Sequence, residues 1–171
     1  MDITDLILDD HAEQRRLFAM LEQIPHDDRH ALGAIWNRLR ALLDTHAEAE
    51  ERFFYPRLMQ VGTGGGDAPS AAAETKDAIK DHNQIRDTGE AVADHEIGTD
   101  AWFDAVDACN LANSKHMAEE ERQGLTDFRR HTTLYERHAF AVRFAAFSAE
   151  NITGVVPVDK DPTSWVDAHQ R

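Results

Sequence analysis

Histidine is frequent in this chain, and four histidines fall where helices would carry apolar residues. The 171 residues include 10 histidines, and imidazole is the commonest metal ligand in proteins. His11, His46, His82 and His116 each interrupt a row of apolar residues with the spacing of one helix face. A polar group at such a position needs a hydrogen-bond or metal partner once it is buried. The four positions therefore predict a buried polar site.

Two glutamates follow two of these histidines at helical spacing. His46 and Glu50, like His116 and Glu120, form the pattern H-x-x-x-E, and residues four apart share a helix face. Each pair can present one nitrogen and one carboxylate oxygen to the same cavity. This mixture of ligands suits iron or manganese better than a closed structural zinc site. The candidate metal ligands are His11, His46, Glu50, His82, His116 and Glu120.

Long helices must position these residues, because the chain is rich in helix-forming residues and poor in proline. Pro25 ends the first helix, Pro56 kinks or breaks the last turn of the second, and the glycine-rich segment 62–70 is a flexible link. The predicted helices are 3–24, 27–61, 71–96, 101–130 and a shorter fifth at 133–150, followed by an extended or irregular tail at 155–171. Short links favour an all-α, up-down-up-down four-helix bundle with an additional C-terminal helix and an irregular tail.

The four histidines have a similar height in such a bundle. His11 and His46 lie 14 and 21 residues from Pro25, and His82 and His116 lie at comparable distances from the neighbouring turns. Antiparallel helices rise by ~1.5 Å per residue, so equal distances from a turn mean equal heights. We therefore expect all four imidazoles to meet roughly midway along the bundle core.

The chain divides into a bundle and a C-terminal part. Residues 1–130 contain the four long helices, and residues 131–171 contain the fifth helix and the tail. The fifth helix is apolar over too much of its circumference to stand free in water. It either packs on the bundle or forms a dimer interface, so both a monomer and a homodimer fit the sequence.

Composition excludes several classes of partner. Lysine and arginine total 18 against 32 acidic residues, a formal net charge of −14, which disfavours binding to nucleic acid or to an anionic membrane. Cys109 is the single cysteine, so an intrachain disulfide is excluded and a reducing compartment is indicated. The acidic N-terminal residues do not form a secretion signal, and no apolar run could cross a bilayer. We expect a cytoplasmic protein.

The ordered ligand set resembles that of the hemerythrin HHE family of non-haem di-iron proteins. The resemblance covers residues 3–130 and includes the context of the two motifs, in segments 46–56 and 116–122. It implies a four-helix bundle that holds two iron ions joined by an oxo or hydroxo bridge. It further implies that His11 and His46 bind one iron, that His82 and His116 bind the other, and that Glu50 and Glu120 bridge them.

The resemblance leaves the activity open. Oxygen-carrying hemerythrins have a further histidine one turn after the third-helix ligand, whereas this chain has Arg86 there. We expect the centre to bind and react with a small diatomic gas or peroxide, namely O2, NO or hydrogen peroxide, with catalase-like peroxide disproportionation as one outcome. The alternative is a protein without catalysis that binds or senses O2 or NO, or buffers iron. Neither the E-x-x-H pattern of ferritin-like di-iron sites nor the H-E-x-x-H pattern of zinc proteases is present.

Residues around the ligands receive simpler interpretations. Tyr55 is expected to be a packing residue before Pro56, with a hydrogen bond to the bridge or a role as a radical sink as the alternatives. Asn113 is expected to donate a hydrogen bond either to a ligand or to a bound oxygen species. Tyr55, Arg86 and Asn113 are also candidates for a sixth ligand. The glutamates beside the motifs are expected to be solvated charges: Glu48, Glu51, Glu119 and Glu121. The remaining histidines are expected on the surface: His26, His30, His95, His131, His138 and His169.

Overall fold

The computed structural model describes residues 1–170, which contain helices and no strand. The α-helices are α1 (Ile3–Leu21), α2 (Arg29–Phe53), α3 (Tyr55–Val61), α4 (Ala71–Ala91), α5 (Asp100–Arg122), α6 (Gly124–His131), α7 (Leu134–Glu150) and α8 (Pro162–His169), and a 3-10 turn, η1 (Val92–Asp94), follows α4. The all-α fold class is confirmed. Within the described range, no helix is both long and apolar enough to span a bilayer.

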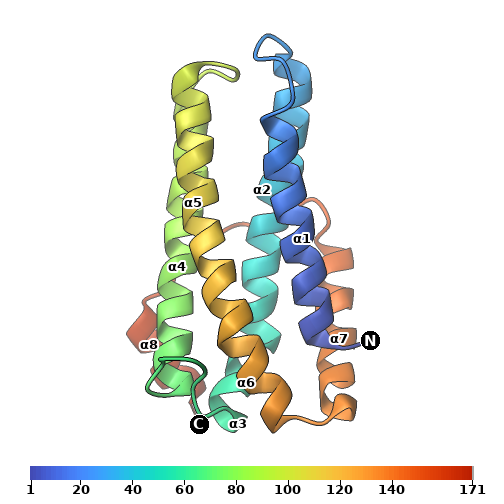
Figure 1. The fold of residues 1–171 in the computed structure, drawn as a ribbon, viewed down its shortest axis with the longest axis vertical. Coiled ribbons are helices and arrows are strands. Elements are labelled where there is room, and N and C mark those ends of the chain that lie inside the picture. Colours follow the sequence, from blue (N-terminus) through green and yellow to red (C-terminus); the bar gives the residue numbers. More distant parts are fainter. Residues whose placement is uncertain (171) are drawn as a thin grey trace.

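The long helices α1, α2, α4 and α5 form an antiparallel four-helix bundle (Figure 1). The predicted bundle topology is confirmed, because α1 packs on α2 and α4 packs on α5, with α2 against α4 and α1 against α5 closing the bundle. Each long helix begins at a side-chain cap: Asp2, Asp28, Ser70 and Thr99 each accept a backbone N–H of the first turn. These caps set where each helix starts, and therefore the height of every ligand within it.

Both helices that carry H-x-x-x-E are interrupted just after the motif. The break after α2 falls at Phe54, two residues before Pro56, as expected from the missing proline N–H and its clash with the preceding turn. The prediction of one continuous helix over 101–130 was wrong, because α5 ends at Arg122 and α6 starts at Gly124. A Cβ at Gly124 would lie 2.9 Å from Glu74 Oε1, so glycine lets α6 approach α4 closely at the cost of helix propensity.

The prediction of an irregular tail over 155–171 was also wrong in part. The helix α8 begins at Pro162, and Asp161 caps it by accepting the Ser164 N–H at 2.8 Å. Asp followed by Pro is a start signal for a helix. Trp165 and Val166 are buried in the apolar cluster that contains Ile7 and Ile79, and α8 packs on α4. The tail is therefore anchored to the bundle.

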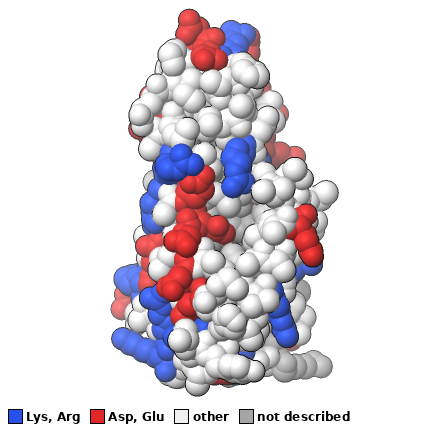
Figure 2. Space-filling model, turned by 90° about the vertical axis from the view of Figure 1, so that its right-hand side faces the viewer, with Lys and Arg blue, Asp and Glu red and all other residues white. Residues whose placement is uncertain are grey.

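The fifth helix of the prediction, α7, packs against α1 and α2. Ala141 and Phe144 are buried in that contact, and the aromatic rings of Phe53 and Phe147 meet edge to face. Its opposite side stays in solvent, with Tyr135 84% exposed. Figure 2 shows this side of the molecule, where a column of acidic side chains runs beside a broad, mostly uncharged surface.

A polar layer divides the bundle core into two apolar clusters. The lower cluster is built around Ile7, Ala49 and Ile79, and the upper one around Leu17, Leu43 and Ile85. Along the chain, the histidine of each bundle helix falls between residues of the lower cluster and residues of the upper cluster. All four histidines are buried. Burial of polar groups without partners is costly, so this layer must be stabilised by contacts within it or by a ligand.

Candidate metal centre

The six residues expected to bind metal come together in this polar layer. His11 comes from α1, His82 from α4, and the two H-x-x-x-E pairs from α2 and α5. Every one of the six is at least 95% buried. Their ligand atoms form two groups, within each of which all atoms lie within 4.8 Å of one another. The first group is His11, His46, Glu50 and Glu120, and the second is Glu50, His82 and His116.

Glu50 belongs to both groups and lies between them. Its Oε1 is 3.0 Å from His46 Nε2, and its Oε2 is 3.3 Å from His82 Nε2 and 3.9 Å from His116 Nε2. The nitrogens of His82 and His116 are only 3.1 Å apart. Glu50 is thus the residue that the two groups of ligand atoms share.

Glu120 has a different environment. Its Oε2 is 3.3 Å from His11 Nε2, while Oε1 accepts a 2.6 Å hydrogen bond from the Tyr55 hydroxyl. Glu120 belongs to the first group of ligand atoms alone. Tyr55, which was expected to be a packing residue, thus holds a candidate ligand. Burial and the carboxylates of Glu120 and Glu50 raise the pKa of Tyr55 well above its ordinary value, so its hydroxyl keeps its proton and donates.

The arrangement leaves buried polar atoms without hydrogen bonds, and these atoms fit a metal. Among the buried polar atoms without a hydrogen bond are five atoms of the predicted ligands: His11 Nε2, His46 Nε2, both carboxylate oxygens of Glu50, and Glu120 Oε2. All of them are lone-pair donors when the imidazoles are neutral, and all point into the same layer. A set of imidazole nitrogens and carboxylate oxygens is the donor chemistry of non-haem iron and manganese sites.

Three of the four histidines are oriented by carboxylates on their other ring nitrogen. The pairs are His11 Nδ1 with Glu121 Oε1 (2.9 Å), His46 Nδ1 with Asp10 Oδ2 (3.0 Å) and His82 Nδ1 with Glu51 Oε1 (2.8 Å). Such hydrogen bonds fix the imidazole tautomer, turn Nε2 toward the metal and raise the basicity of the ligand. This is the outer shell expected around metal-binding histidines.

The expectation that Glu51 and Glu121 are solvated charges was therefore wrong. Glu51 is 3% exposed and also accepts from Arg86, while Glu121 is held by Arg15 on one side and His11 on the other. A signal was present in the sequence, since both motifs read H-x-x-x-E-E-R. The second glutamate directly follows the ligand in sequence. It therefore lies about 100° around the helix axis from the ligand, where it can face a neighbouring helix.

The local charges favour ionised carboxylates. Burial alone would raise the pKa of Glu50, but His46, His116 and His82 hold it well below its usual range. Burial also opposes ionisation of Glu51, yet His82, Arg86 and Lys160 bring its pKa to about 2. Burial would lower the pKa of His46, but Glu50 and Asp10 raise it well above its ordinary value. A cation that binds here therefore replaces protons on the imidazoles.

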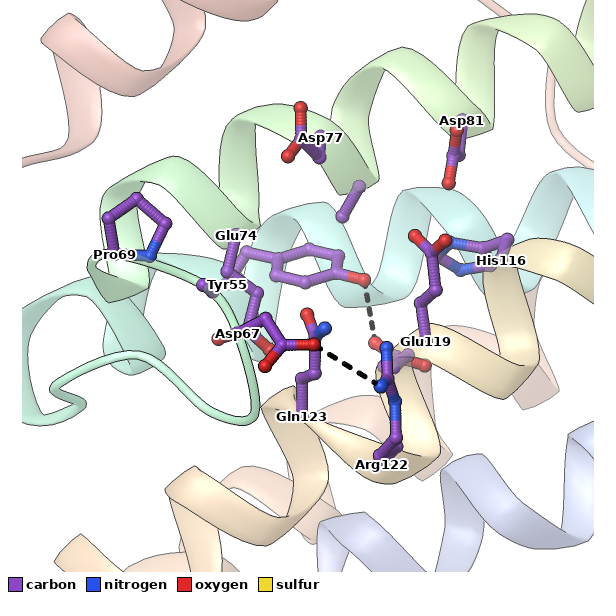
Figure 3. A pocket seen from close by; sticks show the side chains of 13 residues that line it. Tyr55, Asp67, Pro69, Glu74, Asp77, Asp81, His116, Glu119, Arg122 and Gln123 are labelled. Atoms are coloured by element: carbon purple, nitrogen blue, oxygen red, sulfur yellow. Dashed lines mark hydrogen bonds and ion pairs between the residues drawn. The ribbon is translucent and has the colours of Figure 1, made fainter.

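A cavity of about 270 Å³ leads from the surface to this layer (Figure 3). Its lining includes His116, Glu120, Tyr55 and Glu74, as well as acidic residues nearer the surface. Burial raises the pKa of Glu74 to about 7. The cavity is large enough for several waters or a small oxidant.

The other candidates for a sixth ligand face elsewhere. Asn113 donates to Gln14 at 2.9 Å, and Arg86 pairs with Glu51. The Asn113 amide also donates to Met117 Sδ at 3.7 Å, so neither of its partners is one of the six predicted metal ligands. The histidines expected on the surface are exposed, except for His169, which stacks on Trp165 with partial burial.

The fold and the layer together define a class of protein, a four-helix bundle with a buried cation-binding cluster of histidine and glutamate. A family model, the hemerythrin HHE cation binding domain, matches residues 2–142. The chain therefore belongs to the hemerythrin HHE family, as its sequence indicated. No curated protein and no solved structure matched the chain significantly.

Proposed function

We propose that the protein is a non-haem di-iron protein that reacts with O2, peroxide or NO. The observation that carries the proposal is the convergence of four imidazoles and two carboxylates on one buried layer, with Glu50 common to both ligand groups. His11, His46, Glu50 and Glu120 would hold one iron, and His82, His116 and Glu50 the other. Iron bound there would supply one-electron redox chemistry with small oxidants.

The side chains around the ligands would control access and protons. Tyr55 fixes Glu120 by donating its single hydroxyl proton to the carboxylate, and its oxygen, which lines the cavity, can accept a hydrogen bond from a small guest there. The apolar clusters above and below the layer exclude bulk water. Burial raises the pKa of Glu74 to about 7, so this side chain can exchange a proton with the cavity near neutral pH.

The cavity favours a reactive centre over mere storage, because it connects the surface with His116 and Glu120. The candidate reaction is disproportionation of hydrogen peroxide to O2 and water, which needs no electron donor. Reversible binding of O2 or NO is the alternative. Whether added peroxide releases O2 over many turnovers without loss of the visible absorption separates the two.

The first experiment is metal analysis with a visible absorption spectrum, on protein purified in air. We expect two irons per chain, and we expect His82→Ala to lose at least one of them. His95→Ala is the matched control, because His95 is an exposed histidine away from the layer. A wild-type protein with one zinc per chain, or with iron content unaffected by His82→Ala, would contradict the proposal.

A further inference from the structure

The segment that leads into α8 reaches back to the metal centre. Lys160 lies just before the helix cap Asp161 and outside the residues matched by the family model. Its main chain is fixed on α4 by the side chain of Asn83. The Lys160 N–H donates to Asn83 Oδ1 at 3.1 Å, and Asn83 Nδ2 donates to the Lys160 carbonyl at 2.7 Å. This double hydrogen bond holds the lysine at a defined height on the bundle.

The Lys160 ammonium is directed at the carboxylate behind one ligand. It donates to Glu48 Oε2 at 2.6 Å and to Glu51 Oε2, and its side chain is 21% exposed. Glu51 in turn accepts from His82 Nδ1 through its other oxygen, Oε1, which also pairs with Arg86 at 2.8 Å. A continuous path of hydrogen bonds therefore runs from Lys160 through Glu51 to His82.

The other histidines lack an equivalent arrangement. Asp10, behind His46, has no lysine or arginine within ion-pair distance among residues 1–170. Glu121, behind His11, pairs with Arg15, whose side chain is 48% exposed and therefore well screened. Glu51 is contacted by two cations and is itself almost fully buried. The His82 side of the layer thus has more positive charge around it than the His11 and His46 side.

We propose that Lys160 is a positioning residue that acts through Glu51 and limits the negative charge that Glu51 lends to His82. A carboxylate on Nδ1 makes the imidazole a stronger donor, and a cation on the same carboxylate weakens that effect. Arg86 alone already orients Oε1, so the additional effect of Lys160 is mainly one of charge. The C-terminal segment would then set the reduction potential on the His82 and His116 side. This inference rests on the proposed di-iron function.

The test compares Lys160→Met with Lys160→Arg and with Lys80→Met. Methionine keeps much of the apolar stem and removes the charge, arginine keeps the charge, and Lys80 is an exposed lysine on the same helix as His82. In the iron-loaded protein, Lys160→Met should favour the oxidised over the reduced ion about 10-fold, equivalent to a potential lower by about 59 mV for one electron. Lys160→Arg should restore the wild-type potential, and Lys80→Met should leave it unchanged.

Thermal unfolding of the protein as purified provides a readout that needs no iron. If Lys160 acts on Glu51, the decrease in Tm in the double variant Lys160→Met with Glu51→Gln should be smaller than the sum of the two single decreases. A lower Tm with an unchanged potential would make Lys160 a structural brace and overturn the proposal. Additive effects on Tm would also overturn it. Wild-type protein without iron would instead refute the proposed function, while the Tm comparison would still decide whether Lys160 acts on Glu51.

Discussion

Substitution of Glu50 and Glu120 by glutamine should have unequal consequences, although both follow a histidine in the same motif. Glu50 is fully buried and lies 3.0 Å from His46 and 3.3 Å from His82, so it serves both ligand groups. Glu120 serves one group and is also held by Tyr55. We expect Glu50→Gln to lose both metal ions and Glu120→Gln to retain the ion at Glu50, His82 and His116.

The magnitude for the metal-free protein follows from the buried contacts of Glu50. Removal of one partner from a buried ion pair costs about 3–5 kcal/mol. In a domain of this size, each kcal/mol lowers Tm by about 2–4 °C, so Glu50→Gln should lower the Tm of metal-free protein by roughly 6–20 °C. Total stabilities are about 5–15 kcal/mol, so most of the variant should still fold in the cold.

The assay is metal content per chain together with thermal unfolding followed by circular dichroism. Glu119→Gln is the control, because Glu119 neighbours Glu120 but has a side chain that is 42% exposed. Two ions per chain in Glu50→Gln would refute the assignment of Glu50 as the shared ligand. Equal loss of both ions in Glu120→Gln would show instead that both glutamates bridge, as the family resemblance implied.

Three further outcomes are expected. Tyr55→Phe should destabilise the protein by about 1.5–3 kcal/mol in urea unfolding, because a buried carboxylate loses a hydrogen bond; a loss below about 0.5 kcal/mol would contradict the role given to Tyr55. Glu74→Gln should stabilise the protein at pH 8 but not at pH 4. The pKa of Glu74 is about 7 in the folded protein and 4.5 in the unfolded chain, so the wild-type protein loses stability as the pH rises from 4.5 to about 7. At pH 8 we expect the free energy of unfolding of Glu74→Gln to exceed that of wild type by about 1–2 kcal/mol after allowance for solvent screening. An equal effect of the substitution at pH 4 and pH 8 would refute this prediction. Removal of metal by a chelator should lower Tm in calorimetry, and acid should release the metal as the imidazoles take up protons; a Tm insensitive to chelation would argue against a metal in the core.

Some of the site could not be predicted because it depends on how helices face one another. The partner of each Nδ1 comes from another helix: Glu121 for His11, and Glu51 for His82. Helical periodicity places Glu51 about 100° around the axis from Glu50, but the rotation of α2 relative to α4 decides whether that position meets water or a neighbour. The contact of Tyr55 with Glu120 similarly requires α3 to break away from α2 at Phe54.

The bundle, the level of the four histidines and the two motifs on α2 and α5 follow from the sequence alone. These are local properties, because apolar periodicity defines a helix face and residue counts from a turn define a height. Three features depend on how the helices pack: Glu50 lies between two ligand groups, α6 begins separately at Gly124, and Lys160 contacts Glu51. Each of these depends on side chains separated by many residues, whose meeting is set by packing between helices and leaves no periodic trace in the chain.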